Sequence, residues 1–331
     1  MNAWLNRIRM ALLLVALCPA CGSSPTPADE GDAGGADAAV GDSGPGDSGP
    51  GDSGPGDSGP GDSGPGDAGP GDAGVDSVTI LTINFWNRVL NGNWDERRAM
   101  IVGGITSWQP DVVCVQESTS TAGGEFDAEV VARESGYGIE HITTASIPFS
   151  YDEGIAALSR WPIRASDNEQ LPITDLGFAD RYIMSVDVER PDGVLRVFCS
   201  HLSISSDESA KAGEAAQAWQ FMDARRATTS GFFAGDLNAR PDTLAMRLLR
   251  GDASHGGVTG DLIDAWTSAH PGDPGLTHPS DAPEKRIDYV YVVPPTAGPA
   301  AMVVDCERVF TEPVGGVYAS DHIGLLCTFS R

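Results

Sequence analysis

Lysine is almost absent from this chain. Its 331 residues include only Lys211 and Lys285, and 47 acidic residues against 21 basic ones give a formal net charge of −26. After residue 75 the chain keeps 36 acidic and 19 basic residues, so the net charge there is −17. A body this acidic repels nucleic-acid backbones unless a local basic patch overcomes the repulsion, and the sequence contains no such patch.

Cysteine pairs of the C-x-x-C type are also missing, which argues against a structural zinc site. Four cysteines follow residue 75, namely Cys114, Cys199, Cys306 and Cys327. They allow three pairings, and Cys306 with Cys327 is one candidate because both lie on late strand-like runs.

Long apolar runs are missing as well. The longest, "MALLLVAL", follows Arg7 and Arg9 and is too short to span a bilayer as a helix, so residues 1–21 are predicted to be a secretion signal. The next letters, "CPACGSSPTP", resemble the lipobox of bacterial lipoproteins, with Cys21 as the lipidated residue and Cys18 where that motif usually has Leu. Ordinary signal cleavage is the alternative. We therefore expect an exported protein, held in the cell envelope or outer membrane by a lipid anchor, or secreted.

Residues 22–75 are dominated by "GDSGP" repeats. Glycine does not recur at every third position, which excludes a collagen helix. Nothing in this composition can form a core, so the segment is predicted to be a disordered linker spanning roughly 40 Å. Calcium binding by its regularly spaced aspartates is the alternative to a soluble spacer.

Residues 76–331 are long enough for one domain with a sizeable core. Strand-like runs such as "SVTILTINF", "DVVCVQE" and "RIDYVYVV" alternate with helical patterns over 93–108 and 207–223, where Asn93 is a possible N-cap. This alternation predicts a layered α/β or α+β domain. Several strands finish in polar side chains, which is how a rigid sheet presents a site at its edge.

The polar strand ends carry a family resemblance. In order, "LTIN", "VQE", "YDEGIAALSRWPI", "DRY", "SHL", "GDLN", "RIDY" and "SDH" resemble the endonuclease/exonuclease/phosphatase superfamily, which includes DNase I-like nucleases, neutral sphingomyelinases and inositol-phosphate phosphatases. The resemblance runs from about Val78 to Phe329. It implies a four-layer α/β/β/α sandwich of two packed sheets flanked by helices, with the site at one end.

The resemblance also implies the roles of individual residues. Glu117 matches the metal carboxylate, supported by Asn84 and Asp321, and Mg²⁺ is the expected ion with Mn²⁺ or Ca²⁺ as alternatives. A nucleophilic water would attack phosphorus. Among the implied catalytic residues, His322 is the general base and Asp236 orients the water. His201 is a second imidazole with Glu153 as its orienting carboxylate, and Asp288 is a further acid.

Two residues are expected to bind the substrate phosphate. Asn238 would donate hydrogen bonds to it, and the planar fork of Arg181 suits two phosphoryl oxygens. The alternatives are that Arg181 only bridges carboxylates and that Asp288 only pairs with Arg286. His141, His255, His270 and His278 match no motif, so loop or surface roles are predicted for them.

The predicted substrate is a phosphodiester: a lipid headgroup, a small diester or nucleic acid. The scarcity of lysine disfavours a DNase I-type nuclease, whereas a zwitterionic headgroup does not demand a basic surface. Phe85, Trp86 and Trp94 are candidate membrane contacts, or core residues. A non-catalytic binding module is the remaining alternative. The sequence indicates no obligate protein partner.

Overall fold

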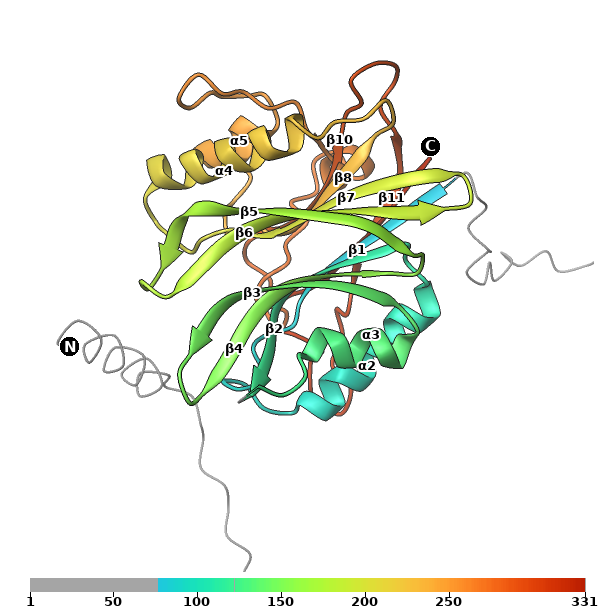
Figure 1. Ribbon diagram of the computed structural model, residues 1–331, viewed down its shortest axis with the longest axis vertical. Coiled ribbons are helices and arrows are strands. Elements are labelled where there is room, and N and C mark those ends of the chain that lie inside the picture. Colours follow the sequence, from blue (N-terminus) through green and yellow to red (C-terminus); the bar gives the residue numbers. More distant parts are fainter. Residues whose placement is uncertain (1–76, 122, 331) are drawn as a thin grey trace, which may run out of the picture. The chain divides into compact units, whose positions relative to one another are not determined.

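The computed structural model describes residues 77–121 and 123–330 (Figure 1). The predicted signal peptide, the predicted lipidation site Cys21 and the predicted linker lie outside these residues. Within the described part of the chain, no helix combines the length and the apolar character needed to cross a bilayer.

The strands form two mixed six-stranded sheets. The first sheet has the order β11 (Met302–Val309), β12 (Gly324–Ser330), β1 (Ser77–Asn84), β2 (Val112–Thr121), β4 (Tyr151–Ser159) and β3 (Gly138–Ile147). The second sheet has the order β5 (Ile163–Asp175), β6 (Ala179–Arg190), β7 (Gly193–His201), β8 (Gly231–Asp236), β10 (Asp288–Val293) and β9 (Ile263–Asp264). In each sheet one parallel pair, β1 with β2 and β7 with β8, is flanked by antiparallel neighbours.

Helices cover the outer faces of both sheets, so the predicted four-layer α/β/β/α sandwich is confirmed. Apolar side chains of α2 (Trp94–Trp108) and α3 (Asp127–Ser135) pack on the first sheet. Those of α4 (Glu208–Asp223) and α5 (Leu244–Leu249) pack on the second. A short helix, α6 (Ala265–Ala269), packs beside β10 and β11. The largest apolar cluster lies between the sheets.

Strand β1 is buried on both of its faces. In β1, Val78 and Ile80 point into the inter-sheet core, whereas Leu81 and Ile83 contribute to the cluster under α2 and α3. A strand buried on both faces has no alternation of polar and apolar residues, which is how its run reads in the sequence.

Both helices predicted from the sequence are present. Asn93 precedes α2 in a left-handed conformation and its side chain makes no capping hydrogen bond. Asp207 does cap α4, because its carboxylate accepts from the amide of Ala210.

Two disulfides lie within the described residues. Cys306 and Cys327 join neighbouring strands β11 and β12, as the sequence favoured, and Cys114 and Cys199 join β2 to β7 across the inter-sheet core. The second bond therefore ties the two sheets together close to the strands that carry the site.

Candidate active site

The polar strand ends named in the sequence meet at one end of the sandwich. Parallel pairing of β7 with β8 sets His201 beside Asp236. Parallel pairing of β1 with β2 sets Asn84 beside Gln116, one residue before Glu117. The two sheets are then bridged, because Asn84 Nδ2 donates to Asp236 Oδ2 over 3.2 Å.

Asp236 is the centre of the cluster. Its Oδ1 accepts from the backbone amide of Asn238 at 2.9 Å, and its Oδ2 lies 3.5 Å from His201 Nε2 and 3.8 Å from His322 Nε2. Burial, together with the charge of Asp288, raises the pKa of Asp236 to about 6, against the opposing effect of His322. The carboxylate therefore sits between two imidazoles and an amide donor.

Gly235 allows β7 and β8 to approach closely enough for this arrangement. Its φ is 155°, and a Cβ at this position would lie 2.0 Å from the carbonyl oxygen of Ser200. Any side chain would push apart the two strands whose next residues are His201 and Asp236.

Glu117 projects from a bulge in β2. The register with β4 shifts between Val115 and Ser118, and Glu117 has a left-handed φ of 54°. Bulges re-aim side chains at functional sites, and a left-handed non-glycine residue is kept there by its surroundings. Asn84 Nδ2 donates to Glu117 Oε1 over 3.0 Å, and the Asn87 amide donates to Oε2 over 3.0 Å, so both carboxylate oxygens are held.

His322 and Asp288 form a buried pair. Nδ1 of His322 lies 3.0 Å and 3.1 Å from the two oxygens of Asp288, which leaves Nε2 facing Asp236. Burial lowers the pKa of His322, but the charges of Asp288 and Asp236 outweigh it and raise the value to about 10. Arg286 pairs instead with Asp264 at 2.8 Å, so the alternative pairing of Asp288 with Arg286 is absent.

Glu153 does not have the contact predicted for it. Its Oε2 accepts from Asn87 Nδ2 over 2.7 Å, and the described contacts include no hydrogen bond to His201. Burial and the neighbouring charge of Glu117 raise the pKa of Glu153 to about 7. The register of β4 against β2 and β3 explains this, because it sets Glu153 opposite Thr119 and Ala145 in the first sheet, whereas His201 belongs to the second.

Arg181 takes the place at His201 that was predicted for Glu153. Its Nη1 lies 3.0 Å from His201 Nδ1, while Nε and Nη2 bind Asp175 Oδ2 at 2.8 Å and 2.7 Å. The side chain is 7% exposed, and all three guanidinium nitrogens have partners inside the protein. Arg181 therefore does not present a free fork to a phosphate, and the predicted role as a direct phosphate ligand is not what its contacts show.

Asn238, the predicted phosphate donor, lies beside His201. Its Nδ2 is 3.1 Å from His201 Nε2 and 3.1 Å from the carbonyl oxygen of Leu202, and its φ of 48° is left-handed. Lys211 Nζ contacts its carbonyl oxygen. The left-handed turn after β8 directs this amide back toward the imidazole of His201.

Sequence reasoning missed His278. Its ring stands edge-on to His322 with centroids 4.6 Å apart, and its Nε2 lies 3.6 Å from Asp321 Oδ2. The segment carrying it is fastened to the "SDH" motif, because the Ser280 amide donates to the carbonyl of Asp321 and the Ile323 amide to that of Thr277. No motif marks His278, since its place follows from this pairing of two loops.

Glu214 and Arg97 also support the site without belonging to a motif. Glu214 on α4 is fully buried and accepts from the Ser203 amide, which holds the segment that follows His201. Arg97 on α2 is fully buried and donates to the carbonyls of Phe85 and Gly92, which shapes the segment after β1. Buried charged residues that hydrogen-bond to loop carbonyls or amides fix loop conformation.

The donors present fit a hard divalent cation. Glu117, Asp236, Asp288 and Asp321 lie in or beside the cluster. Burial first, and then the charge of a neighbouring carboxylate, raise the pKa values of Asp236 and Glu153. Oxygen-rich sites with excess negative charge suit Mg²⁺ or a similar ion. Two residue sets have ligand atoms within 4.8 Å of one another, His278 with Asp321 and His322, and Asp236 with Asp288 and His322. In the second set, Nδ1 of His322 is already hydrogen-bonded to Asp288. We therefore describe His322 and Asp288 as a hydrogen-bonded pair and not as two metal ligands.

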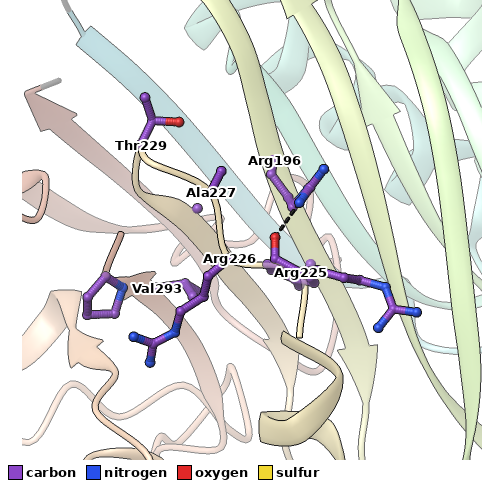
Figure 2. A pocket seen from close by; sticks show the side chains of 9 residues that line it. Arg196, Arg225, Arg226, Ala227, Thr229 and Val293 are labelled. Atoms are coloured by element: carbon purple, nitrogen blue, oxygen red, sulfur yellow. Dashed lines mark hydrogen bonds between the residues drawn. The ribbon is translucent and has the colours of Figure 1, made fainter. Parts of the chain in front are cut away.

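A small cavity lies elsewhere in the second sheet. This cavity has a volume of about 10 Å³ and is lined by residues that include Arg196, Arg225, Arg226 and Val293. Arg196 donates there to the carbonyl of Arg225 (Figure 2). Two of its lining residues, Gly231 and Val293, are the first residue of β8 and the last residue of β10. Asp236 and Asp288 lie at the other ends of these two strands. A space of this size holds about one water molecule. The end of the sandwich that carries the candidate active site is therefore separate from this cavity.

Comparisons with known proteins agree with the fold and the motif order. A family model described as "Endonuclease/Exonuclease/phosphatase family" matches residues 81–322. No curated protein matches the chain.

Several solved structures share the fold. A humanized variant of D. rerio TDP2 has a TM-score of 0.61 at 19% identity, covering 77% of this chain and 100% of that one. A family protein from Leptotrichia buccalis has a TM-score of 0.59 at 19% identity, with coverages of 77% and 100%. The human Nocturnin catalytic domain with bound sulfate has a TM-score of 0.61 at 18% identity, with coverages of 77% and 94%.

Proposed function

Because the chain belongs to the endonuclease/exonuclease/phosphatase family, we propose that it is a metal-dependent phosphodiesterase. The observation that carries the proposal is the convergence of three side chains on Asp236, each within 4 Å. Asn84 ends β1 and His322 precedes β12, both of the first sheet, whereas His201 ends β7 of the second. A purely structural sheet edge has no need to bury two imidazoles and several carboxylates together.

Glu117, Asn84 and Asp321 are the proposed metal residues. Glu117 is fixed by two donors, and Asp321 is partly exposed at the rim of the site, which leaves oxygens available to an ion. When bound, a divalent cation supplies charge neutralisation at the phosphoryl oxygens. The side-chain nitrogen of Asn84 already donates hydrogen bonds to Glu117 and Asp236. Asn84 would therefore support the metal indirectly, by positioning those two carboxylates.

The proton-handling residues follow from the hydrogen bonds. Asp288 holds Nδ1 of His322, so Nε2 is the atom that exchanges a proton with water or substrate. With its pKa raised to about 10, His322 is an imidazolium at neutral pH, and acting as a base requires that it first lose this proton. Asp236, between Nε2 of His322 and Nε2 of His201, is the proposed orienting group for the attacking water.

His201 and Asn238 are the proposed donors to phosphate. Burial and the neighbouring Arg181 lower the pKa of His201 well below its usual value, so its ring is neutral. A neutral imidazole and an amide donate hydrogen bonds without adding charge, and they stabilise negative charge that develops on phosphoryl oxygens.

A lipid headgroup or another small phosphodiester is the proposed substrate. The net charge of −17 after residue 75 opposes binding of a long polyanion. An extracellular nuclease of the DNase I type and a non-catalytic surface module remain the alternatives.

We also propose export with a lipid anchor at Cys21. Labelling with a radioactive fatty acid tests the anchor, and label that persists in Cys21→Ser contradicts it.

The test of the function uses the purified chain and bis(p-nitrophenyl) phosphate with Mg²⁺. We expect release of p-nitrophenol that stops with a chelator and falls at least 100-fold in Glu117→Gln and His322→Ala. Glu189→Gln, an exposed carboxylate on β6, is the matched control and should retain the wild-type rate. Folded wild-type protein that hydrolyses neither this diester nor p-nitrophenyl phosphate with Mg²⁺, Mn²⁺ or Ca²⁺ would favour the binding module. Full activity in Glu117→Gln would show that the metal assignment is wrong.

A further inference from the structure

Exposed apolar side chains are concentrated at the end of the sandwich that carries the site. Among the described residues, the large hydrophobic side chains with high exposure are Val89, Leu90, Phe149, Leu176, Ile204, Met302, Val304 and Val314. The first five of these lie on four separate connections. We call these five residues the apolar rim.

Strand registers place all four connections at the same end. The segment carrying Val89 and Leu90 follows Asn84, and the one carrying Ile204 follows His201. The β3–β4 turn with Phe149 lies beyond the pairing of Tyr151 with Thr121, the last residue of β2. The fourth connection is the β5–β6 turn with Leu176, which lies beyond the pairing of Ile183 on β6 with Ser200 on β7, one residue before His201. In Figure 1 both hairpin turns extend toward the left-hand side of the view.

Hydrogen bonds attach the apolar rim to the site itself. The Ile204 amide donates to Asp175 Oδ2, the oxygen that also binds Arg181, and Asp175 immediately precedes Leu176. The Val89 amide donates to Asn87 Oδ1, and Asn87 Nδ2 donates to Glu153. The loops that carry Val89, Leu176 and Ile204 are therefore held by the same residues that surround His201 and Glu117.

The tips are apolar and also uncharged. Segments 89–92, 148–150, 176–178 and 203–206 contain no Asp, Glu, Lys or Arg, in a chain that carries 47 acidic and 21 basic residues. Phe149 is fully exposed. Contiguous exposed apolar surface with a polar surround marks an interaction site, and aromatic and aliphatic side chains at headgroup depth are typical of proteins that lie on a bilayer.

We propose that the apolar rim docks this end of the domain onto the surface of a zwitterionic phospholipid bilayer. An anionic bilayer is disfavoured because the domain is strongly acidic and the rim offers no lysine or arginine to offset the repulsion. The aromatic residues expected from the sequence do not form the surface, since Phe85 is buried and Trp86 and Trp94 are partly buried. The docking itself does not depend on the proposed function. Only the idea that docking presents a headgroup phosphodiester to the site rests on that function.

Flotation with phosphatidylcholine vesicles tests the proposal. Every protein in the comparison is the full chain carrying Cys21→Ser, so that the proposed lipid anchor cannot contribute. The rim variant Leu90→Ser/Phe149→Ser/Ile204→Ser is compared with a matched control, Met302→Ser/Val304→Ser, which alters exposed apolar residues on the edge strand β11. All substitutions are at exposed positions, and circular dichroism verifies that both variants are folded.

We expect the parent chain and the β11 control to bind phosphatidylcholine vesicles equally, and the rim variant to bind at least tenfold more weakly. Equal loss in both variants, no effect of the rim variant, or binding only to phosphatidylserine vesicles would overturn the proposal. Because vesicle binding is measured without turnover, an inactive protein that still binds through the rim would contradict the proposed function and leave the docking surface intact.

Discussion

Arg181 Nη1 lies 3.0 Å from Nδ1 of His201. Arginine has no acceptor, so the imidazole nitrogen must accept, and the proton of the neutral ring is on Nε2. That atom faces the Asp236 carboxylate, 3.5 Å away, on the side of the site. The guanidinium is itself held by Asp175. A chain of contacts from β5 through β6 to β7 therefore fixes which tautomer His201 presents.

We expect Arg181→Lys to lower kcat by about 10- to 100-fold, because a charged hydrogen bond of this kind contributes roughly 1.5–3 kcal/mol. Lysine cannot bind Asp175 and His201 simultaneously in a fork. The measurement is kcat on a soluble diester together with the imidazole ¹⁵N shifts of His201, which report the tautomer. An unchanged tautomer with a reduced rate would mean that Arg181 acts by packing alone.

Asp288→Asn should reduce kcat by roughly 10²- to 10⁴-fold, the range for loss of general acid–base function. Asparagine keeps the shape of the side chain but removes the charge that raises the pKa of His322. NMR titration of His322 in metal-free protein should show its pKa falling in the variant. If the pKa falls but the rate does not, the pair is structural.

The sequence predicted the members of the site better than their contacts. Residues on β1, β2, β7 and β8 were identifiable because an apolar run stops at a polar residue, and the parallel pairs then bring them together. Asp288 instead begins β10, and antiparallel pairing sets it opposite Asp236. The contacts of Glu153 and Arg181 were not identifiable, because they depend on which sheet each strand joins. Strand β5 was missed for a related reason: most of its residues are exposed, so it has no apolar pattern.

The sequence could not predict that His278 lies in the site, because its position depends on hydrogen bonds between its own loop and the loop that carries Asp321. We expect His278→Ala to lower kcat about 5- to 10-fold, since the ring of His322 loses the edge-on contact at 4.6 Å. His278→Phe should stay within about threefold of wild type, because an aromatic ring preserves that contact. Steady-state kinetics on both variants decide the point. If Phe behaves like Ala, the important atom is Nε2 beside Asp321 and not the ring.

We expect acid stability to depend on His141, a histidine that belongs to none of the proposed catalytic or metal residues. It lies on β3 against Phe126, with ring centroids 3.9 Å apart, and burial lowers its pKa to about 4. The folded protein binds a proton here less readily than the unfolded chain, whose value is about 6.5. The stabilisation is therefore present above about pH 6.5 and is lost as the pH falls toward 4.

The loss from this group is at most about 3 kcal/mol, by the 1.36 kcal/mol per pKa unit that applies to a fully realised shift. We expect the difference in Tm between pH 7 and pH 4.5 to shrink by several degrees in His141→Gln, because glutamine does not titrate. His255→Gln, a histidine in the segment after α5, is the control and should leave that difference unchanged. A pH dependence that is the same in His141→Gln and wild type would show that other groups, such as the site carboxylates, govern acid unfolding.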